Sequence, residues 1–373
     1  MKDLNTCRQE IDAIDTQIMK LFEQRMKVSK NVIEYKLAHD MEIFQPEREK
    51  AVIEKNVQRM ESEELKTYGA AFIQDVMDIS KSYQAEFIPT QDLYHPLPHK
   101  NENIVVGYQG VPGAFGHQAM LQYFGEVDNK NYPLFEDVYK AIVNHEIDYG
   151  IVPLENSSTG AINDNYDLVR NYNLYIVGEY NLSISQHLLG IKGAQLEDLK
   201  EVYSHPQGLH QCSHFLAKHP QIIQRNYTNT AASAKYISQL QDKTKGAIAS
   251  LQAAQLYNLD VIQEDIHNSS MNHTRFIVIG RHLEDSSHAN VCSIVFTLQH
   301  KVGALYSVLK AVKDHQINLS RIESRPIVDK NWQYYFYIDL EGSIHDQNVK
   351  MMLQEMKTHC LTMRVLGNYQ QAK

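Results

Sequence analysis

A long run of helical periodicity near the N-terminus is the sequence feature that most constrains this fold. Apolar side chains recur over residues 5–39 with gaps that alternate four and three, the spacing of a helix that packs against other helices. The seam consists of Cys7, Ile11, Ile14, Ile18, Leu21, Arg25, Val28, Val32 and Tyr35. A rise of about 1.5 Å per residue makes this helix roughly 50 Å long, so a unit of about 90 residues cannot bury its whole face.

Two further helices complete this N-terminal segment. The run Gln45-Pro46-Glu47-Arg48-Glu49 restarts a helix, with proline in the first turn and acidic side chains near the positive end of the helix dipole. A third helix runs from about Glu64 to Glu86. Its apolar face is formed by Leu65, Tyr68, Phe72, Val76, Ile79 and Tyr83.

Cations and neutral donors lie among these apolar positions. Arg25 sits within the seam, where a charge is costly unless it is paired. Lys36 is rotated from Arg25 by only about 20°, so both side chains project from one face. Ser80 and Gln84 form an i,i+4 pair on the third helix. These groups suit an anionic ligand inside a helical bundle, although a buried ion pair with ordinary surface charge would explain them too.

Arg8 cannot join Arg25 in a site within one chain. It lies about 26 Å away along the helix and points about 100° off. Arg8 would complete such a site only from a second, antiparallel copy.

Residues 4–87 resemble the all-helical chorismate mutase family. The matching site positions are Arg8, Arg25, Lys36, Arg48, Glu49, Ser80 and Gln84. The resemblance implies a domain over residues 1–88 that forms an intertwined homodimer and rearranges chorismate to prephenate. It implies that Arg8 and Arg25 bind the substrate carboxylates, that Lys36 and Gln84 donate to the ether oxygen, and that the other three contact the remaining carboxylate and hydroxyl. Gln45 replaces an aspartate of some members, so altered affinity is expected.

A proline-containing polar stretch, Ile88 to Asn103, separates this block from an alternation of strands and helices. The alternation starts at Ile104 and extends to Ile279, which predicts an α/β domain. The segment Gly178–Ile191 is rich in β formers, and we expect it to cross between two lobes.

Four polar segments in this central block have a chemical character. The richest is Val152–Asp164, which follows a strand and precedes a helix; it either places ligand-binding groups at a sheet edge or simply caps the helix. The loop Gly110–Phe115 is an anion cradle or a plain tight turn. Ser204-His205-Pro206-Gln207 could cap a helix over 207–218, and Thr274 could lie at the edge of strand 276–279.

In order and spacing, these segments resemble the prephenate dehydratase domain, over residues 104–281. The resemblance implies two lobes like those of periplasmic binding proteins, with the site in the cleft, and conversion of prephenate to phenylpyruvate. Thr274 would hydrogen-bond the departing hydroxyl, with Glu155 as proton source or orienter. The remaining expected substrate contacts come from Asn156, Ser204, Gln211 and Arg275. Ala114 replaces a loop hydroxyl of many members, which puts that contact in doubt.

Residues 291–368 follow a second polar break and show the order β-α-β-β-α-β, an α+β, ferredoxin-like pattern. They resemble the ACT domain, an amino-acid sensor, which implies feedback inhibition by L-phenylalanine. Gly303 would open a helix whose amides attract a carboxylate. The expected effector contacts are Gly303, Ala304, Leu305, Glu323, Ser324, Arg325 and Pro326. The alternative is a dimerisation module without a ligand.

Composition narrows the remaining possibilities. Lys and Arg number 36 against 45 Asp and Glu, a net charge of −9, so nucleic acid is not an expected partner. No apolar stretch reaches the ~20 residues of a membrane span, no secretory signal is apparent, and the four cysteines are isolated. We therefore expect a cytoplasmic protein without metal or cofactor.

Two functional interpretations follow. The first is a bifunctional chorismate mutase/prephenate dehydratase, a homodimer or tetramer whose ligands are chorismate, prephenate and L-phenylalanine. The second is a non-catalytic amino-acid-sensing protein. Within the first, preference for arogenate over prephenate stays open.

Overall fold

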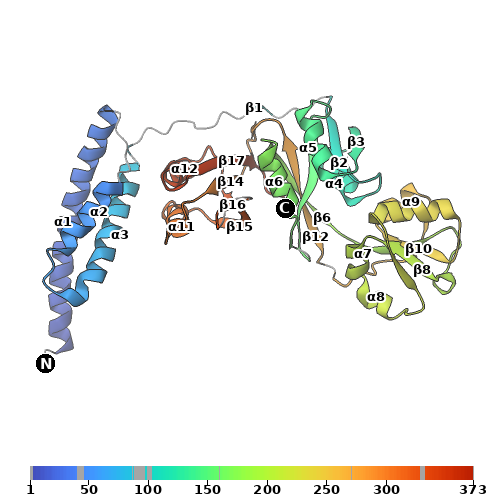
Figure 1. The fold of residues 1–373 in the computed structure, drawn as a ribbon, viewed down its shortest axis with the longest axis horizontal. Helices are drawn as coiled ribbons and strands as arrows, with labels where there is room; N and C mark the ends of the chain where they lie inside the picture. Colours follow the sequence, from blue (N-terminus) through green and yellow to red (C-terminus); the bar gives the residue numbers. More distant parts are fainter. Residues whose placement is uncertain are drawn as a thin grey trace.

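The computed structural model describes residues 3–39, 46–85, 87, 97–98, 103–158, 160–269, 271–327 and 332–372. Along the chain, its helices and strands form a helical group, a central α/β group and a C-terminal α+β group (Figure 1). Among the described residues, no helix combines the length and the apolar character that crossing a bilayer requires.

The helical group contains α1 (Leu4–Ala38), α2 (Pro46–Val57), a short 3-10 turn (Glu63–Leu65) and α3 (Lys66–Ala85). Asp3 caps α1, since its carboxylate accepts from the amides of Asn5 and Thr6. Met26 and Ile33 of α1 and Met77 of α3 are buried.

The predicted seam of α1 lies mostly outside this small core. Ile11, Leu21 and Tyr35 are exposed by 55%, 64% and 59%. Ile14, Ile18, Val28 and Val32 of the seam, and Tyr68, Phe72 and Ile79 of α3, are exposed as well. A single chain therefore leaves the seam without the helical packing that its spacing predicts.

The central group contains two sheets. The first is built from five strands in the order β6-β12-β4-β2-β3 and the second from β11-β7-β10-β8-β9. The first-sheet strands are β2 (Val105–Gln109), β3 (Asp128–Tyr132), β4 (Tyr149–Asn156), β6 (Tyr175–Ser183) and β12 (His273–Gly280), and β5 (Gly160–Ala161) pairs with β4. The second-sheet strands are β7 (His187–Gly190), β8 (Glu201–Ser204), β9 (Ile223–Asn226), β10 (Lys245–Ala249) and β11 (Asp260–Gln263).

Helices pack on these sheets. With the first sheet lie α4 (Phe115–Phe124), α5 (Phe135–Val143) and α6 (Asn163–Asn171). With the second lie α7 (Pro206–Gln211), α8 (Ser213–Ala217), α9 (Thr230–Leu240) and α10 (Leu251–Leu256), after a short 3-10 turn at Leu196–Asp198. The helix expected over 207–218 is thus two helices that meet at Cys212.

The chain passes between the sheets twice. Strand β6 belongs to the first sheet and the next strand, β7, to the second, so the predicted crossing within Gly178–Ile191 is confirmed. The chain returns from β11 to β12, which pairs antiparallel with both β6 and β4. The neighbouring strands β4 and β12 therefore meet this passage, β4 at its end and β12 at its start.

The C-terminal group follows the predicted order of strands and helices. Its elements are β14 (Val291–Thr297), α11 (Ala304–Asp314), β15 (Leu319–Pro326), β16 (Tyr334–Glu341), α12 (Gln347–His359) and β17 (Thr362–Tyr369). Before it, β13 (Glu284–Asp285) pairs with β1 (Leu97–Pro98), a contact that the sequence did not suggest.

A parallel pairing of β17 with β6 joins the C-terminal sheet to the first central sheet. At this junction Gly367 faces Ile176, and a Cβ on Gly367 would lie 2.3 Å from the Ile176 carbonyl oxygen. An apolar core continues across it, since Tyr337 and Leu366 belong to the same cluster as Tyr166. The C-terminal group is therefore packed onto the first lobe rather than tethered to it.

Candidate active sites

A cavity of about 380 Å³ lies between the two lobes of the central group. Its lining includes Asn156 at the end of β4, Thr274 near the start of β12, Gln211 in α7, and residues 228–230 at the start of α9. Loop residues Ala114 and Phe115 also line it. The cavity thus unites three of the predicted polar segments with the Gly110–Phe115 loop.

Thr274 and Asn156 form the polar centre of this cleft. They face each other across β12 and β4, and Asn156 Nδ2 donates to Thr274 Oγ1 over 2.9 Å. Asn156 Oδ1 accepts from the amide of Ser158 over 3.0 Å, which fixes the amide's orientation. Because Thr274 Oγ1 accepts from Asn156, its own proton is left to donate elsewhere.

Two buried residues, Gln186 in the lining of the cavity and Asn272 beside Asn156, were not among the predicted site residues. Asn272 Oδ1 accepts from Asn156 Nδ2 over 2.9 Å and from Ser158 Oγ over 2.8 Å. Gln186 Nε2 donates to Gln211 Oε1 over 3.2 Å. Among the described residues, Asn272 Nδ2 and Gln186 Oε1 have no hydrogen-bond partner. Two features of the sequence could have indicated these residues. Asn272 lies two positions before Thr274, and Gln186 lies within the predicted crossing segment Gly178–Ile191.

Ser204 lies beneath the cleft rather than at its surface. It is wholly buried, and its Oγ donates to the carbonyl of Ile248 over 2.7 Å. His205, not Ser204, caps α7, because its Nδ1 accepts from the amide of Gln207. Burial lowers the pKa of His205. Ser204 therefore supports the wall of the cleft in this conformation.

The structure decides between the two interpretations that the sequence left open for each of the segments Val152–Asp164 and Gly110–Phe115. The N-cap of α6 is Ile162, which makes no side-chain cap, so Val152–Asp164 is not a polar helix cap. Instead, β4 and β5 pair within it. The loop Gly110–Phe115 is a tight turn, in which Ala114 N donates to Val111 O over 3.0 Å. A Cβ on Gly113 would lie 3.3 Å from Cα of Ala253, so the second lobe approaches this turn closely.

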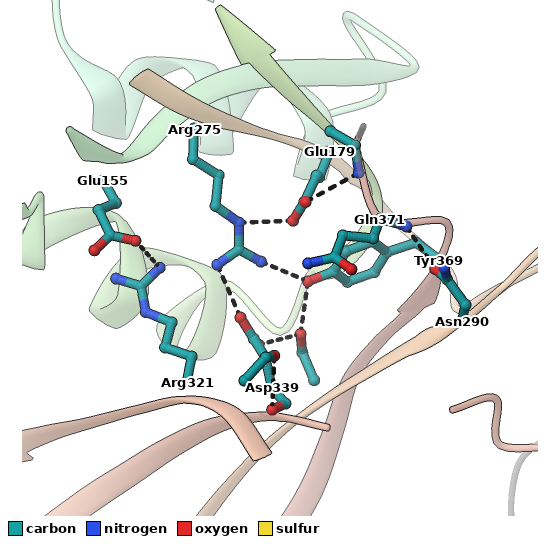
Figure 2. A network of polar contacts seen from close by, with 11 residues as sticks. Glu155, Glu179, Arg275, Asn290, Arg321, Asp339, Tyr369 and Gln371 are labelled. Atoms are coloured by element: carbon teal, nitrogen blue, oxygen red, sulfur yellow. Dashed lines mark hydrogen bonds and ion pairs between the residues drawn. The ribbon is translucent and has the colours of Figure 1, made fainter. Parts of the chain in front are cut away.

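Glu155 and Arg275 lie on the opposite face of the sheet from Thr274. They pair with each other across β4 and β12, one position from the Asn156–Thr274 pair, and side chains alternate along a strand. Glu155 forms an ion pair of 2.7 Å with Arg321 of β15 (Figure 2). The expectation that Glu155 supplies the proton is corrected by this placement.

Arg275 is likewise committed to protein partners. It contacts Glu179 of β6 over 2.6 Å, Asp339 of β16 over 2.8 Å and the Tyr369 hydroxyl of β17 over 2.9 Å (Figure 2). Burial alone would lower its pKa, but Tyr369, Asp339 and Glu179 together raise the pKa of the guanidinium above its usual value. The expectation that Arg275 holds a substrate carboxylate is therefore corrected.

In the helical group, the structure brings part of the predicted site together. Ser80 Oγ lies 2.7 Å from Ser29 Oγ and accepts from Gln84 Nε2 over 3.1 Å. Arg25 Nη1 donates to the carbonyl of Val76, and burial lowers the pKa of Arg25. Ser29 was not predicted.

The remaining predicted residues of this site differ in exposure. Arg8 and Arg48 are exposed, and Lys36 is half-buried near the end of α1. The side chain of Glu49 and the whole of Gln45 lie outside the described part of the structure. A groove of about 1070 Å³ on this group, lined by Met26, Ile79 and others, contains none of the predicted site residues.

The two segments that contain the expected effector residues follow or include strand ends at the same end of the C-terminal sheet. Strands β14 and β15 both pair antiparallel with β16, where Thr297 and Arg325 flank the same residue, Tyr335. Gly303 opens α11 just beyond β14 with a φ of 78°, a conformation that favours glycine. Arg325 also reaches the first lobe, contacting Asp167 of α6 over 2.8 Å.

Comparisons with known proteins agree with this organisation. Family models described as chorismate mutase type II and prephenate dehydratase match residues 7–85 and 106–284. The bifunctional chorismate mutase/prephenate dehydratase of Aquifex aeolicus (strain VF5) is 34% identical, over 100% of this chain and 99% of that protein. Arogenate dehydratase 2 of Petunia hybrida is also 34% identical, over 78% and 80%.

A solved structure resembles most of this chain. Prephenate dehydratase from Arthrobacter aurescens, in complex with L-Phe, superimposes with a TM-score of 0.66 at 27% identity. The match covers 72% of this chain and 90% of that one.

Proposed function

This chain belongs to the family of bifunctional chorismate mutase/prephenate dehydratases, and we propose that its two activities reside in the helical group and the interlobe cleft. The enzyme rearranges chorismate to prephenate, then removes carbon dioxide and the ring hydroxyl to give phenylpyruvate, within phenylalanine biosynthesis. The observation that supports the placement of dehydration is the Asn156–Thr274 pair inside the cleft.

The rearrangement needs positioning rather than a nucleophile or proton transfer. A site that holds a compact conformer and stabilises charge on the ether oxygen supplies the catalysis. Arg25 and Arg8 would bind the two carboxylates, since guanidinium forks suit them, and Lys36 and Gln84 would donate to the ether oxygen. The Ser80–Gln84 hydrogen bond supports this arrangement, because it orients the Gln84 amide.

Dehydration is driven by formation of the aromatic ring. The bond from the ring to its carboxylate breaks, and its electron pair moves through the ring to expel the hydroxyl group, which leaves as water after taking a proton. Thr274 is too weak an acid to provide that proton unaided. It would instead donate a hydrogen bond to the departing oxygen, a role supported by the direction of the Asn156 contact.

The mutase site would be shared between two chains. Arg8 and Arg25 lie about 26 Å apart on one straight helix, so one chain cannot bring both to a single substrate. The exposed seam of α1 offers the surface on which an antiparallel second copy would pack. This supports an intertwined homodimer in which Arg8 comes from the partner.

L-phenylalanine would bind at the edge of the C-terminal sheet formed by Gly303 and the end of β15. The related Arthrobacter aurescens protein was solved with L-Phe. In this chain, the Arg325–Asp167 contact connects that edge to the first lobe, so an effector there could favour one lobe arrangement over another.

A time course with purified enzyme and chorismate tests this proposal. Without L-phenylalanine, prephenate should appear transiently and phenylpyruvate should accumulate. With L-phenylalanine, chorismate should disappear at an unchanged rate while prephenate accumulates. Phenylpyruvate formation that is insensitive to L-phenylalanine would overturn the regulatory part, and a parallel arogenate assay would give the substrate preference.

A further inference from the structure

The Arg275 side chain takes part in a closed ring of hydrogen bonds that lies behind the catalytic cleft. Arg275 Nη2 donates to the Tyr369 hydroxyl, and Arg275 Nη1 donates to Asp339 Oδ2. Ser293 Oγ donates to Asp339 Oδ1 and lies 2.8 Å from the Tyr369 hydroxyl. Because the Ser293 proton goes to Asp339, the Tyr369 proton goes to Ser293, and the ring closes.

The direct partners of Arg275 come from three strands. Glu179 is on β6, which pairs with β12, while Asp339 and Tyr369 are on β16 and β17 of the C-terminal group. The chain end contributes too, because the amide of Ala372 donates to Glu179 Oε1 over 3.0 Å. Arg275 is thus anchored mainly by the C-terminal group (Figure 2).

Arg275 is also the residue next to Thr274 on β12. Alternation along the strand directs Thr274 into the cleft and Arg275 into the junction behind it. The pairing of β12 with β4 shifts register between Arg275 and Phe276, so the backbone ladder is irregular immediately beside Thr274. The ladder between β12 and β6 is regular from His273 to Val278, so the anchor at Arg275 adds to the positioning of this segment mainly on the β4 side.

We propose that Arg275 is a positioning residue for dehydration, through which the C-terminal group holds Thr274 at its place in the cleft. The proposal rests on the proposed role of Thr274. A buried guanidinium that loses one partner must find another, and the strand that carries it shifts when it does. A displacement of about 1 Å at a catalytic group is enough to cost up to ~10²-fold in rate.

The test removes partners of Arg275 that lie far from the substrate. Asp339→Asn keeps the side-chain shape but removes the charge, and Tyr369→Phe removes only the hydroxyl. Glu355→Gln is the matched control, because Glu355 forms an ion pair with His315 in the same C-terminal group and its side chain has the same 12% exposure as Asp339. Chorismate mutase activity of the same chain serves as the internal standard.

With prephenate as substrate, Asp339→Asn and Tyr369→Phe should both show a kcat lower by about tenfold or more and a KM within about twofold of wild type. Glu355→Gln should keep both values. If the partners of Arg275 only stabilised the fold, the variants would yield less folded protein, and the kcat of the folded fraction would not change.

Either of two results would overturn the proposal: folded Tyr369→Phe and Asp339→Asn with the kcat of Glu355→Gln, or variants that raise KM alone. Thr274→Val, measured in the same series, tests the proposed role of Thr274 separately from the positioning role of Arg275. If Thr274→Val keeps dehydrating prephenate, the proposed role of Thr274 fails, whatever the network variants do.

Discussion

Thr274 illustrates how a hydrogen-bond direction at a single residue constrains chemistry. Asn156 donates to Thr274 Oγ1 because its own carbonyl oxygen is committed to the Ser158 amide. The threonine proton is then free to point at a departing oxygen. This orientation depends on an amide at position 156 that donates rather than accepts.

Asn156→Asp tests that direction at nearly constant shape. The carboxylate cannot donate, so the Thr274 proton would turn to it and away from the substrate. We expect dehydratase kcat to fall by at least about 10²-fold, the scale of losing a preorganised donor. Steady-state kinetics with prephenate checks this. Full activity of folded Asn156→Asp would contradict it.

Three histidines, one buried (His187) and two partly buried (His117 and His205), predict how stability depends on pH. His117, His187 and His205 each accept a backbone amide at Nδ1, and burial lowers the pKa of each. The unfolded chain, where histidine has a pKa near 6.5, then binds more protons. The stability that these groups contribute is present above that pH and is lost as the pH falls below it.

The melting temperature should therefore be lower at about pH 5.5 than at about pH 7.5. His117→Asn, whose amide oxygen can still accept from Gly113, should reduce the difference between the two values. Calorimetry at both pH values measures it. An identical pH dependence in wild type and variant would show that His117 titrates alike in both states.

For single residues, the sequence could predict which motifs belong to the site. It could not predict which of two adjacent motif residues faces the cleft. Asn156 and Thr274 lie where expected, whereas Glu155 and Arg275 point to the far side of the sheet. Side chains alternate along strands, so adjacent motif residues cannot share one cavity. The buried partners of Arg275 are remote in sequence, and no local pattern indicates them.

At the scale of elements, α1 is the helix whose sequence and structure differ most in what they bury. Its seam has the spacing of packed helices, yet in one chain most of it is exposed. Local periodicity predicted the helix and its apolar face correctly. It could not supply the packing partner, because that partner is expected to be a second copy.

Complementation tests the shared mutase site. Arg8→Ala and Arg25→Ala should each be inactive as mutases, because each loses a carboxylate-binding group. After subunit exchange, half of the dimers are heterodimers with one intact site, so about a quarter of wild-type activity should return. Heterodimers can be isolated with two different affinity tags. If isolated heterodimers stay inactive, each site is built within one chain.

On the scale of the whole molecule, the C-terminal group belongs to the same packed body as the first lobe. Strand β17 extends the sheet through β6, and one apolar cluster includes side chains of both groups. Among the described residues, the apolar clusters of the central and C-terminal groups take no side chain from α1–α3. The sequence predicted the order of elements in each group, but the junction depends on contacts between distant residues.

Two deletions should therefore behave differently. Removing residues 1–96 should leave a folded dehydratase, whereas removing residues 291–373 uncovers Tyr166 and Ile176 and leaves Arg275 without Asp339 and Tyr369. We expect the second protein to be insoluble or to melt at a temperature lower by 10 °C or more, which corresponds to a loss of about 2.5–5 kcal/mol. A stable, active C-terminal deletion would contradict the account of a single packed body.

We propose that one chain contains two chemically independent sites and that dehydration depends on Thr274. The most direct measurement supplies chorismate to Thr274→Val and follows all three metabolites by chromatography. We expect that chorismate disappears at the wild-type rate, that prephenate accumulates, and that phenylpyruvate formation falls by at least about 10²-fold. Phenylpyruvate at the wild-type rate, or chorismate that is no longer consumed by the folded variant, would contradict it.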